Sequence, residues 1–163
     1  MTVARLRGGP AREAELLDAV LDVLRETGYE RLTVDAVAAR ARASKRTVYR
    51  RWPSKAELVV AAFANAVLDA PEPPDTGSLR EDLLALFDSL RRELDGLADV
   101  IAGLVGELRH NPDLASAMRT GYLDARVRSV HIVFDRARAR AELSPDADVE
   151  LIWPLVPATL FFR

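Results

Sequence analysis

Residues 44–52 read S-K-R-T-V-Y-R-R-W, a short stretch rich in basic and hydroxyl side chains. Ser44 is a favourable helix N-cap because its hydroxyl can accept a hydrogen bond from a first-turn backbone N–H. Val48 and Trp52 are four residues apart, so they share one face of a helix and can anchor it to a core. The stretch therefore predicts a short helix that is fixed by two apolar side chains and presents cations on its other faces.

The basic character extends beyond this helix. The formal net charge of the 163-residue chain is −2. Residues 1–70 nevertheless hold twelve Lys and Arg against nine Asp and Glu, a charge of +3, and the remainder holds eleven against sixteen, a charge of −5. A basic N-terminal part joined to an acidic remainder indicates that only the first part meets a polyanion. Between residues 40 and 55 all charged side chains are cations: Arg40, Arg42, Lys45, Arg46, Arg50, Arg51 and Lys55.

Composition argues against several classes of protein. The chain has no Cys and only two His, His110 and His131, so neither a thiolate nor a His-rich metal site is expected, and no cofactor is predicted. No apolar run approaches the ~18 residues of a membrane span, and the N-terminus lacks the apolar region of a signal peptide. We therefore expect a cytoplasmic protein that does not enter a membrane.

The segment before Ser44 predicts two helices and a turn. Pro10 suits the first turn of a helix, and Gly28 suits its end. Thr33 is the expected N-cap of a short second helix, and three or four residues separate that helix from Ser44. Two short helices joined by such a turn match a helix-turn-helix, whose second helix enters the major groove of DNA. Arg42 stands where these turns commonly have Gly, and a left-handed Arg would cost ~1 kcal/mol.

Further helices are expected throughout the rest of the chain, and the sequence gives no clear strand signal. Ser54 and Glu57 form a capping box that opens another helix, which would place Lys55 beside the basic helix. Residues 70–77 are a polar connector, and helices are predicted over 78–90, 97–109 and 114–143. The last apolar stretch, 149–162, ends at Arg163 without a cap, so we expect a chain cut short there or a helix that forms an oligomer surface.

Residues 32–58 read L-T-V-D-A-V-A-A-R-A-R-A-S-K-R-T-V-Y-R-R-W-P-S-K-A-E-L, and this segment resembles the signature of the tetracycline-repressor (TetR) family of bacterial transcription regulators. The resemblance covers about residues 10–65. It departs from the usual pattern at Arg42 and Ala43. It implies an all-α protein with a flexible basic arm (1–9), a three-helix helix-turn-helix DNA-binding domain (10–69) and a C-terminal helical bundle (70–163) that dimerises and binds an effector.

The resemblance and the chemistry of the side chains together give the candidate DNA contacts. Lys45 and Arg46 lie in the first turn of the basic helix, where side chains reach base edges, and Arg can pair bidentately with guanine. Phosphate contact alone is the simpler alternative for both. The residues expected to contact the DNA backbone are Thr33, Ser44, Thr47, Tyr49, Arg50, Arg51 and Lys55.

A ligand pocket is harder to find in the sequence. Aromatic and His side chains could line a site between the C-terminal helices, although each could equally be ordinary core. An apolar lining would favour a lipophilic small-molecule effector. The candidates are Phe87, Tyr122, His131, Phe134 and Trp153.

Three functions are therefore weighed. The leading one is a ligand-responsive regulator, a repressor that binds a palindromic operator as a homodimer. An enzyme is not expected, because no converging set of catalytic groups is visible in the sequence. The remaining alternative is a helical protein–protein interaction module whose basic helix docks on an acidic partner.

Overall fold

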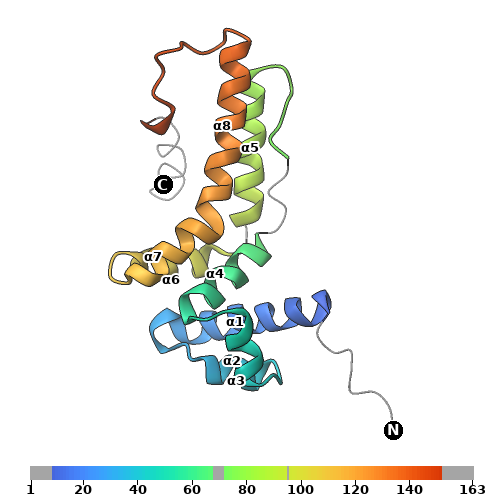
Figure 1. The fold of residues 1–163 in the computed structure, drawn as a ribbon, viewed down its shortest axis with the longest axis vertical. Coiled ribbons are helices and arrows are strands. Elements are labelled where there is room, and N and C mark those ends of the chain that lie inside the picture. The colour runs from blue at the N-terminus through green and yellow to red at the C-terminus, as the bar shows by residue number, and fades with distance from the viewer. Residues whose placement is uncertain (1–8, 68–71, 95, 152–163) are drawn as a thin grey trace. The chain divides into compact units, whose positions relative to one another are not determined.

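The computed structural model describes residues 9–67, 72–94 and 96–151, and these residues form helices and loops without a strand (Figure 1). The first helices are α1 (Pro10–Arg31), α2 (Val34–Arg40), α3 (Lys45–Arg51) and α4 (Lys55–Ala66). They are followed by α5 (Leu79–Leu94), α6 (Ala98–Leu108), α7 (Pro112–Met118), the π-helical turn η1 (Arg119–Leu123) and α8 (Asp124–Ala139). The predicted all-α class is confirmed. Most of the predicted basic arm and the apolar stretch after residue 151 lie outside the described residues.

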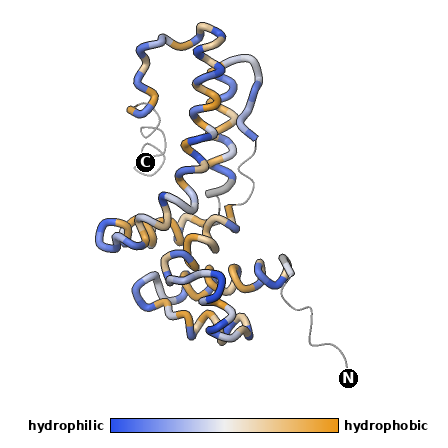
Figure 2. The backbone as a smooth tube through the Cα atoms, viewed as in Figure 1, coloured by the Kyte–Doolittle hydropathy of each residue, from blue (hydrophilic) through white to orange (hydrophobic). Residues whose placement is uncertain are grey.

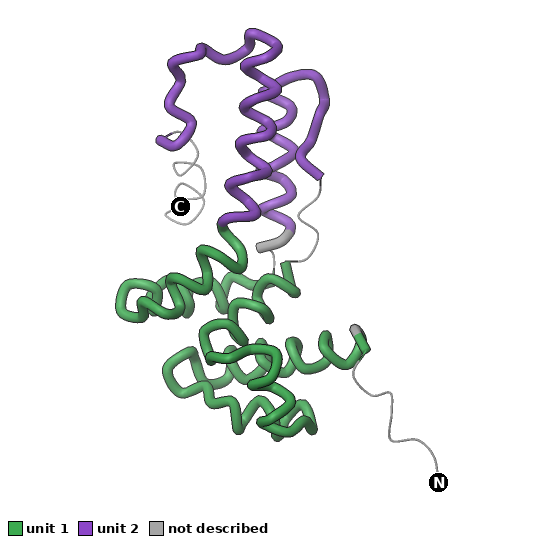
Figure 3. The backbone as a smooth tube through the Cα atoms, viewed as in Figure 1, with its two compact units in different colours: residues 1–69, 93–123 green, residues 70–92, 124–163 purple. Residues whose placement is uncertain are grey.

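The chain divides into two compact units (Figure 3). Unit 1 comprises residues 1–69 and 93–123, and unit 2 comprises residues 70–92 and 124–163. The sequence analysis placed a boundary at residue 70. Unit 1 also takes in α6, α7 and η1, because α6 packs on α1 and both α7 and η1 pack on α4.

Unit 1 is built around α1 and α4, which make the most extensive helix contact in the described residues. Val20 of α1, Val37 of α2, Val48 of α3 and Leu58 of α4 are fully buried in one shared core. Gly28 interrupts α1 with φ 74° and ψ 169°, a conformation open to Gly, and a final turn then continues to Arg31. The predicted helix end at Gly28 is thus a kink. All four N-terminal helices consequently share one hydrophobic core.

Unit 2 is formed by α5 and α8, along which hydrophobic and hydrophilic residues alternate (Figure 2). Leu86 packs with Val130, Val133 and other apolar residues in a second core. Asp82, fully buried, accepts hydrogen bonds from the N–H and Oγ1 of Thr76, both 2.7 Å, and from Arg140 Nη2 at 3.1 Å. Burial raises the pKa of Asp82, but these hydrogen bonds outweigh it and lower the pKa. They attach the connector before α5 to the C-terminal end of α8.

The single long helix predicted from Leu114 to about Leu143 differs from the one observed. Helical residues do run without a break from Pro112 to Ala139, but five of them form the π turn η1. The helix also ends earlier than predicted, where Ala141 has φ 59°. Apolar spacing does not reveal a π turn, which depends on what the turn packs against.

The turn between α2 and α3 is a Schellman motif with Arg42 at the left-handed position, where φ is 49°. The N–H of Ala43 donates to the Ala38 carbonyl at 2.9 Å, and the N–H of Arg42 donates to the Ala39 carbonyl at 3.2 Å. The guanidinium of Arg12, on α1, donates to the carbonyls of Ala41 and Arg42. These bonds hold a conformation that costs an L-residue other than Gly about 1 kcal/mol.

Replacing Arg42 by Gly should therefore increase stability. We expect Arg42→Gly to raise the free energy of unfolding by up to about 0.5 kcal/mol, because the relief of strain exceeds the entropy that Gly adds to the unfolded chain. Urea unfolding followed by circular dichroism measures the difference. Arg42→Ala is the matched control, since it removes the same side chain and keeps the strain. Equal stabilities for the two variants would show that the strain does not exceed the entropy that Gly adds to the unfolded chain.

Candidate DNA-binding interface

The basic helix α3 is fixed at its start by a side-chain cap. The Oγ of Ser44 accepts a hydrogen bond from the N–H of Thr47 at 3.1 Å, as the sequence predicts for an N-cap. The hydroxyl of Thr47 lies 2.8 Å from the same oxygen. The N-cap of α2 is formed in the same way, because Thr33 Oγ1 accepts from the N–H of Ala36 at 3.2 Å. Three of the predicted DNA-contact residues thus also define the helix starts.

Two apolar residues hold α3 on unit 1. Val48 has no exposed surface and Trp52 is 9% exposed, and both belong to the core shared with α1 and α4. Their four-residue spacing fixes which face of the helix is buried. Packing in the core, and not the charges themselves, therefore determines which residues of α3 lie on its exposed face.

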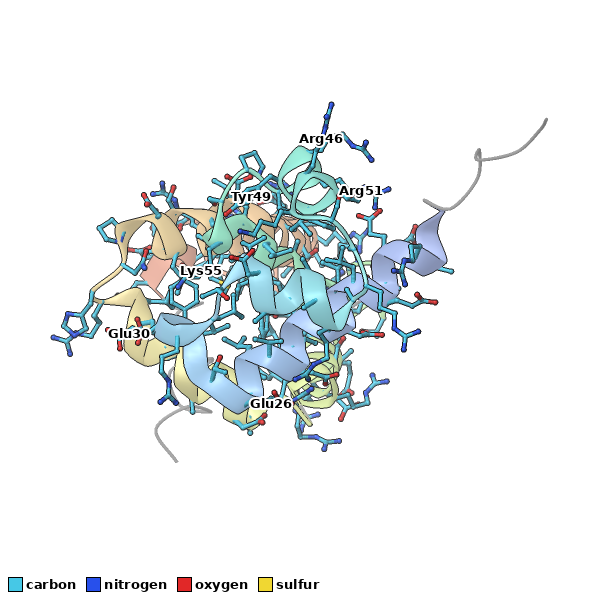
Figure 4. All side chains as sticks on the ribbon, turned by 90° about the horizontal axis from the view of Figure 1, so that it is seen from below. Glu26, Glu30, Arg46, Tyr49, Arg51 and Lys55 are labelled. Carbon is cyan, nitrogen blue, oxygen red and sulfur yellow. The ribbon has the colours of Figure 1, made fainter. Side chains whose placement is uncertain are left out.

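That outer face carries Arg46, Tyr49 and Arg50, all exposed. Figure 4 shows Arg46 on the side of α3 that points away from the other helices of unit 1. Tyr49 is 49% exposed, which is unusual for an aromatic ring and leaves its hydroxyl accessible. The arrangement offers two guanidinium groups and a phenol to a ligand with negative charge.

Two other cations of α3 have acidic partners within unit 1. Lys45 pairs with Asp35 of α2, and Arg51 pairs with Glu13 of α1. The Lys45 and Asp35 side chains are each about 60% exposed, at 60% and 61%. Exposed pairs of this kind contribute about 0–1 kcal/mol, so a phosphate group can replace the carboxylate at little cost.

Lys55 occupies a different place from its neighbours. Its Nζ donates to the carbonyl oxygens of Tyr29 at 2.9 Å and of Glu30 at 3.2 Å, and lies 4.4 Å from the centroid of the Tyr29 ring. These carbonyls belong to the last turn of α1, where the Tyr29 carbonyl also accepts from the N–H of Leu32 at 3.3 Å. Lys55 thus joins the end of α1 to the start of α4, and its predicted contact with a DNA phosphate stays a prediction.

Sequence reasoning missed the groups that hold these side chains. Arg12 contacts a turn about thirty residues away in sequence, and Glu13 is 38 residues from Arg51. Arg40 likewise forms two hydrogen bonds, 2.8 Å and 2.6 Å, with the carboxylate of Glu26 on α1, and the pKa of Glu26 is lowered chiefly by that hydrogen bonding. No local sequence pattern predicts these long-range contacts, because they depend on how α1 crosses α2 and α3.

The residues proposed for a ligand pocket are distributed over both units. Tyr122 belongs to unit 1, where its ring meets that of Phe63 edge-on at a centroid distance of 5.0 Å, and burial raises its pKa to about 12. Phe87 is half-buried on α5, Phe134 is in the second core, and His131 pairs with Glu150 at 3.0 Å. Trp153 lies outside the described residues. Their grouping into one pocket stays a prediction.

Across residues 9–67, 72–94 and 96–151, no three acidic or His side chains gather closely enough to hold a metal ion. Within the same part of the chain, no helix is both long and apolar enough to cross a bilayer. The basic surface of α3 is thus the site with the clearest chemical character.

Comparison with known proteins identifies the fold around this surface. Residues 16–62 match the model of bacterial regulatory proteins of the tetR family, and residues 73–163 match the tetracyclin repressor-like C-terminal domain. The chain belongs to the TetR family. A TetR-family protein is a helix-turn-helix transcription regulator, so the predicted family and the predicted DNA-binding, ligand-responsive function are confirmed. The family consists of regulators and is not one of enzymes.

Individual relatives and a solved structure support the same family assignment. The chain is 47% identical over 152 residues to an uncharacterized HTH-type transcriptional regulator of Mycobacterium tuberculosis, Rv1556, covering 93% of this chain and 75% of that protein. It is 39% identical over 157 residues to the DNA-binding transcriptional repressor TetR of Mycobacteroides abscessus, covering 95% and 83%. The crystal structure of the TetR family transcription regulator SCO0332 superposes with a TM-score of 0.72 at 31% identity, covering 93% and 85%.

Proposed function

We propose that this chain is a cytoplasmic transcriptional repressor that binds a roughly palindromic operator as a homodimer and leaves it when a small-molecule effector binds. The observation that carries the proposal is the outer face of α3, where Arg46, Tyr49 and Arg50 are exposed on a helix that is capped and anchored. Two such helices in a dimer would enter successive major grooves about 34–36 Å apart. A relative described as a repressor, from Mycobacteroides abscessus, supports the direction of regulation.

The proposed roles follow from position on α3 and its surroundings. Arg46, with Lys45, reads base edges, because first-turn side chains of a recognition helix reach into the groove. Lys45 and Arg51 exchange their carboxylate partners for DNA groups on binding. The remaining contacts are to the DNA backbone, through Thr33, Ser44, Thr47, Tyr49, Arg50, Arg51 and Lys55. The alternative of a protein-docking module does not explain the match to the family of bacterial regulatory proteins.

The readout role of Arg46 is testable with an operator selected from random duplexes by the wild-type protein. We expect Arg46→Ala to relax the preference at one position in each half-site, with a loss of about 1–3 kcal/mol for the preferred base there. Affinity measured against every single-base change in the operator reports this. Arg128→Ala, an exposed cation on α8, is the control and should leave the profile unchanged. An unaltered preference profile for Arg46→Ala would overturn the readout role.

The effector is proposed to be lipophilic, bound among Phe87, Tyr122, His131, Phe134 and Trp153. A ligand at 100 times its Kd stabilises the folded state by about 2.7 kcal/mol, so a genuine effector should raise the melting temperature measurably. A thermal-shift screen should therefore find hits among apolar compounds and none among small polar ones. If only polar compounds stabilise the protein, the lipophilic assignment is wrong.

A further inference from the structure

Helix α4 packs against the π turn η1, and Gly121 of η1 lies against Val60 of α4. A Cβ atom placed on Gly121 would lie 2.8 Å from Cγ1 of Val60, in the middle of α4. Two carbon atoms in ordinary contact are about 3.5–4.0 Å apart. Any side chain at position 121 would therefore require the Val60 side chain, α4 or η1 to shift by about half an ångström or more.

Space, and not backbone conformation, is what requires glycine here. The glycines with positive φ among the described residues are Gly28, Gly77 and Gly96, so Gly121 has a backbone that Ala can adopt. In α6, a Cβ atom added to Gly103 or Gly106 would meet no neighbouring atom within 4 Å. Among these three positions, steric crowding therefore requires glycine only at position 121, where Val60 is the neighbour.

On the α4 side the surroundings of this contact leave little room for it to relax, whereas Gly121 itself lies at the surface. Val60 is 2% exposed and Phe63, one turn further along α4, is 4% exposed. The ring of Phe63 meets that of Tyr122 at an interplanar angle of 76°. Close-packed interiors transmit a small displacement because their voids are few. A π turn is also a local irregularity that often occurs at functional sites.

The position of α4 bears directly on the recognition helix. α4 begins at Lys55, three residues after Trp52, and its first turn is fixed by the Ser54 cap and by the bonds from Lys55 to the end of α1. Val60 lies five residues from that start, about 7.5 Å along the helix axis. A shift of α4 at Val60 would therefore act on the segment that ends α3. Recognition requires side chains placed within about 0.5 Å, so a small shift would matter there.

We propose that Gly121 is a positioning residue for operator recognition. Because Gly121 has no side chain, η1 can pack closely against Val60, and this contact determines where α4 lies beside α3. The inference rests on the proposed function, because it concerns the same DNA-binding surface. It assigns no contact with DNA to Gly121 itself.

The test compares Gly121→Ala with wild type on two duplexes, the operator selected by the wild-type protein and a scrambled sequence. Affinity for the operator should fall about tenfold, the size of one imperfect base-pair contact. Affinity for the scrambled duplex should stay within about twofold, because the cations that bind any DNA are retained. A purely structural role would change the melting temperature but not this ratio.

Three further variants complete the test. Gly103→Ala is the matched control and should bind both duplexes as the wild type does. Val60→Ile adds a methyl group toward Gly121 from the other side and should reproduce the loss, which keeps the test valid should Gly121→Ala fail to fold. The double variant Gly121→Ala/Val60→Ala removes the clash and should recover most of the operator affinity.

The outcomes separate the two proposals. A wild-type protein without preference for any selected duplex would contradict the proposed function. The positioning role alone would be overturned by a different result. In that case the wild type prefers its selected operator, and a folded Gly121→Ala or Val60→Ile variant binds that operator with unchanged affinity. Failure of the double variant to recover affinity would also overturn it.

Discussion

The recognition helix depends on the core beneath it. α3 has seven residues, four of them cations, and an isolated helix shorter than ~12 residues is marginal in water. Val48 and Trp52 bury it against α1 and α4, and the Ser44 hydroxyl satisfies an N–H at its start. Burial of the same two side chains also determines which face of α3 is exposed. The burial of apolar surface therefore determines which cations are accessible to DNA.

Electrostatics then acts on a surface already fixed by packing. Lys45 and Arg51 are paired with Asp35 and Glu13, whereas Arg46 and Arg50 extend from the exposed face. Pairing keeps two cations in place and offsets their mutual repulsion, and each exposed pair contributes about 0–1 kcal/mol. DNA binding then exchanges weak internal carboxylates for a base edge at Lys45 and a phosphate at Arg51, aided by the release of counterions from the duplex.

Much of this arrangement could be predicted from the sequence, because local chemistry decides it. The caps at Thr33, Ser44 and Ser54 are side-chain bonds to an N–H three residues ahead, and each is observed. The left-handed turn at Arg42 follows from its place between two helices. Other features depend on residues far apart in sequence, which local patterns do not encode. They are the contacts of Arg12 and Lys55, the π turn, and the close packing of Gly121 against Val60.

The central claim is that α3 confers sequence-specific DNA binding, and fluorescence anisotropy tests it most directly. The protein is titrated onto the selected operator and onto a scrambled duplex at several salt concentrations. The account predicts tighter binding to the operator at each concentration, with affinity that falls steeply and linearly in a log–log plot against salt. Equal affinity for both duplexes throughout, or affinity independent of salt, would contradict it.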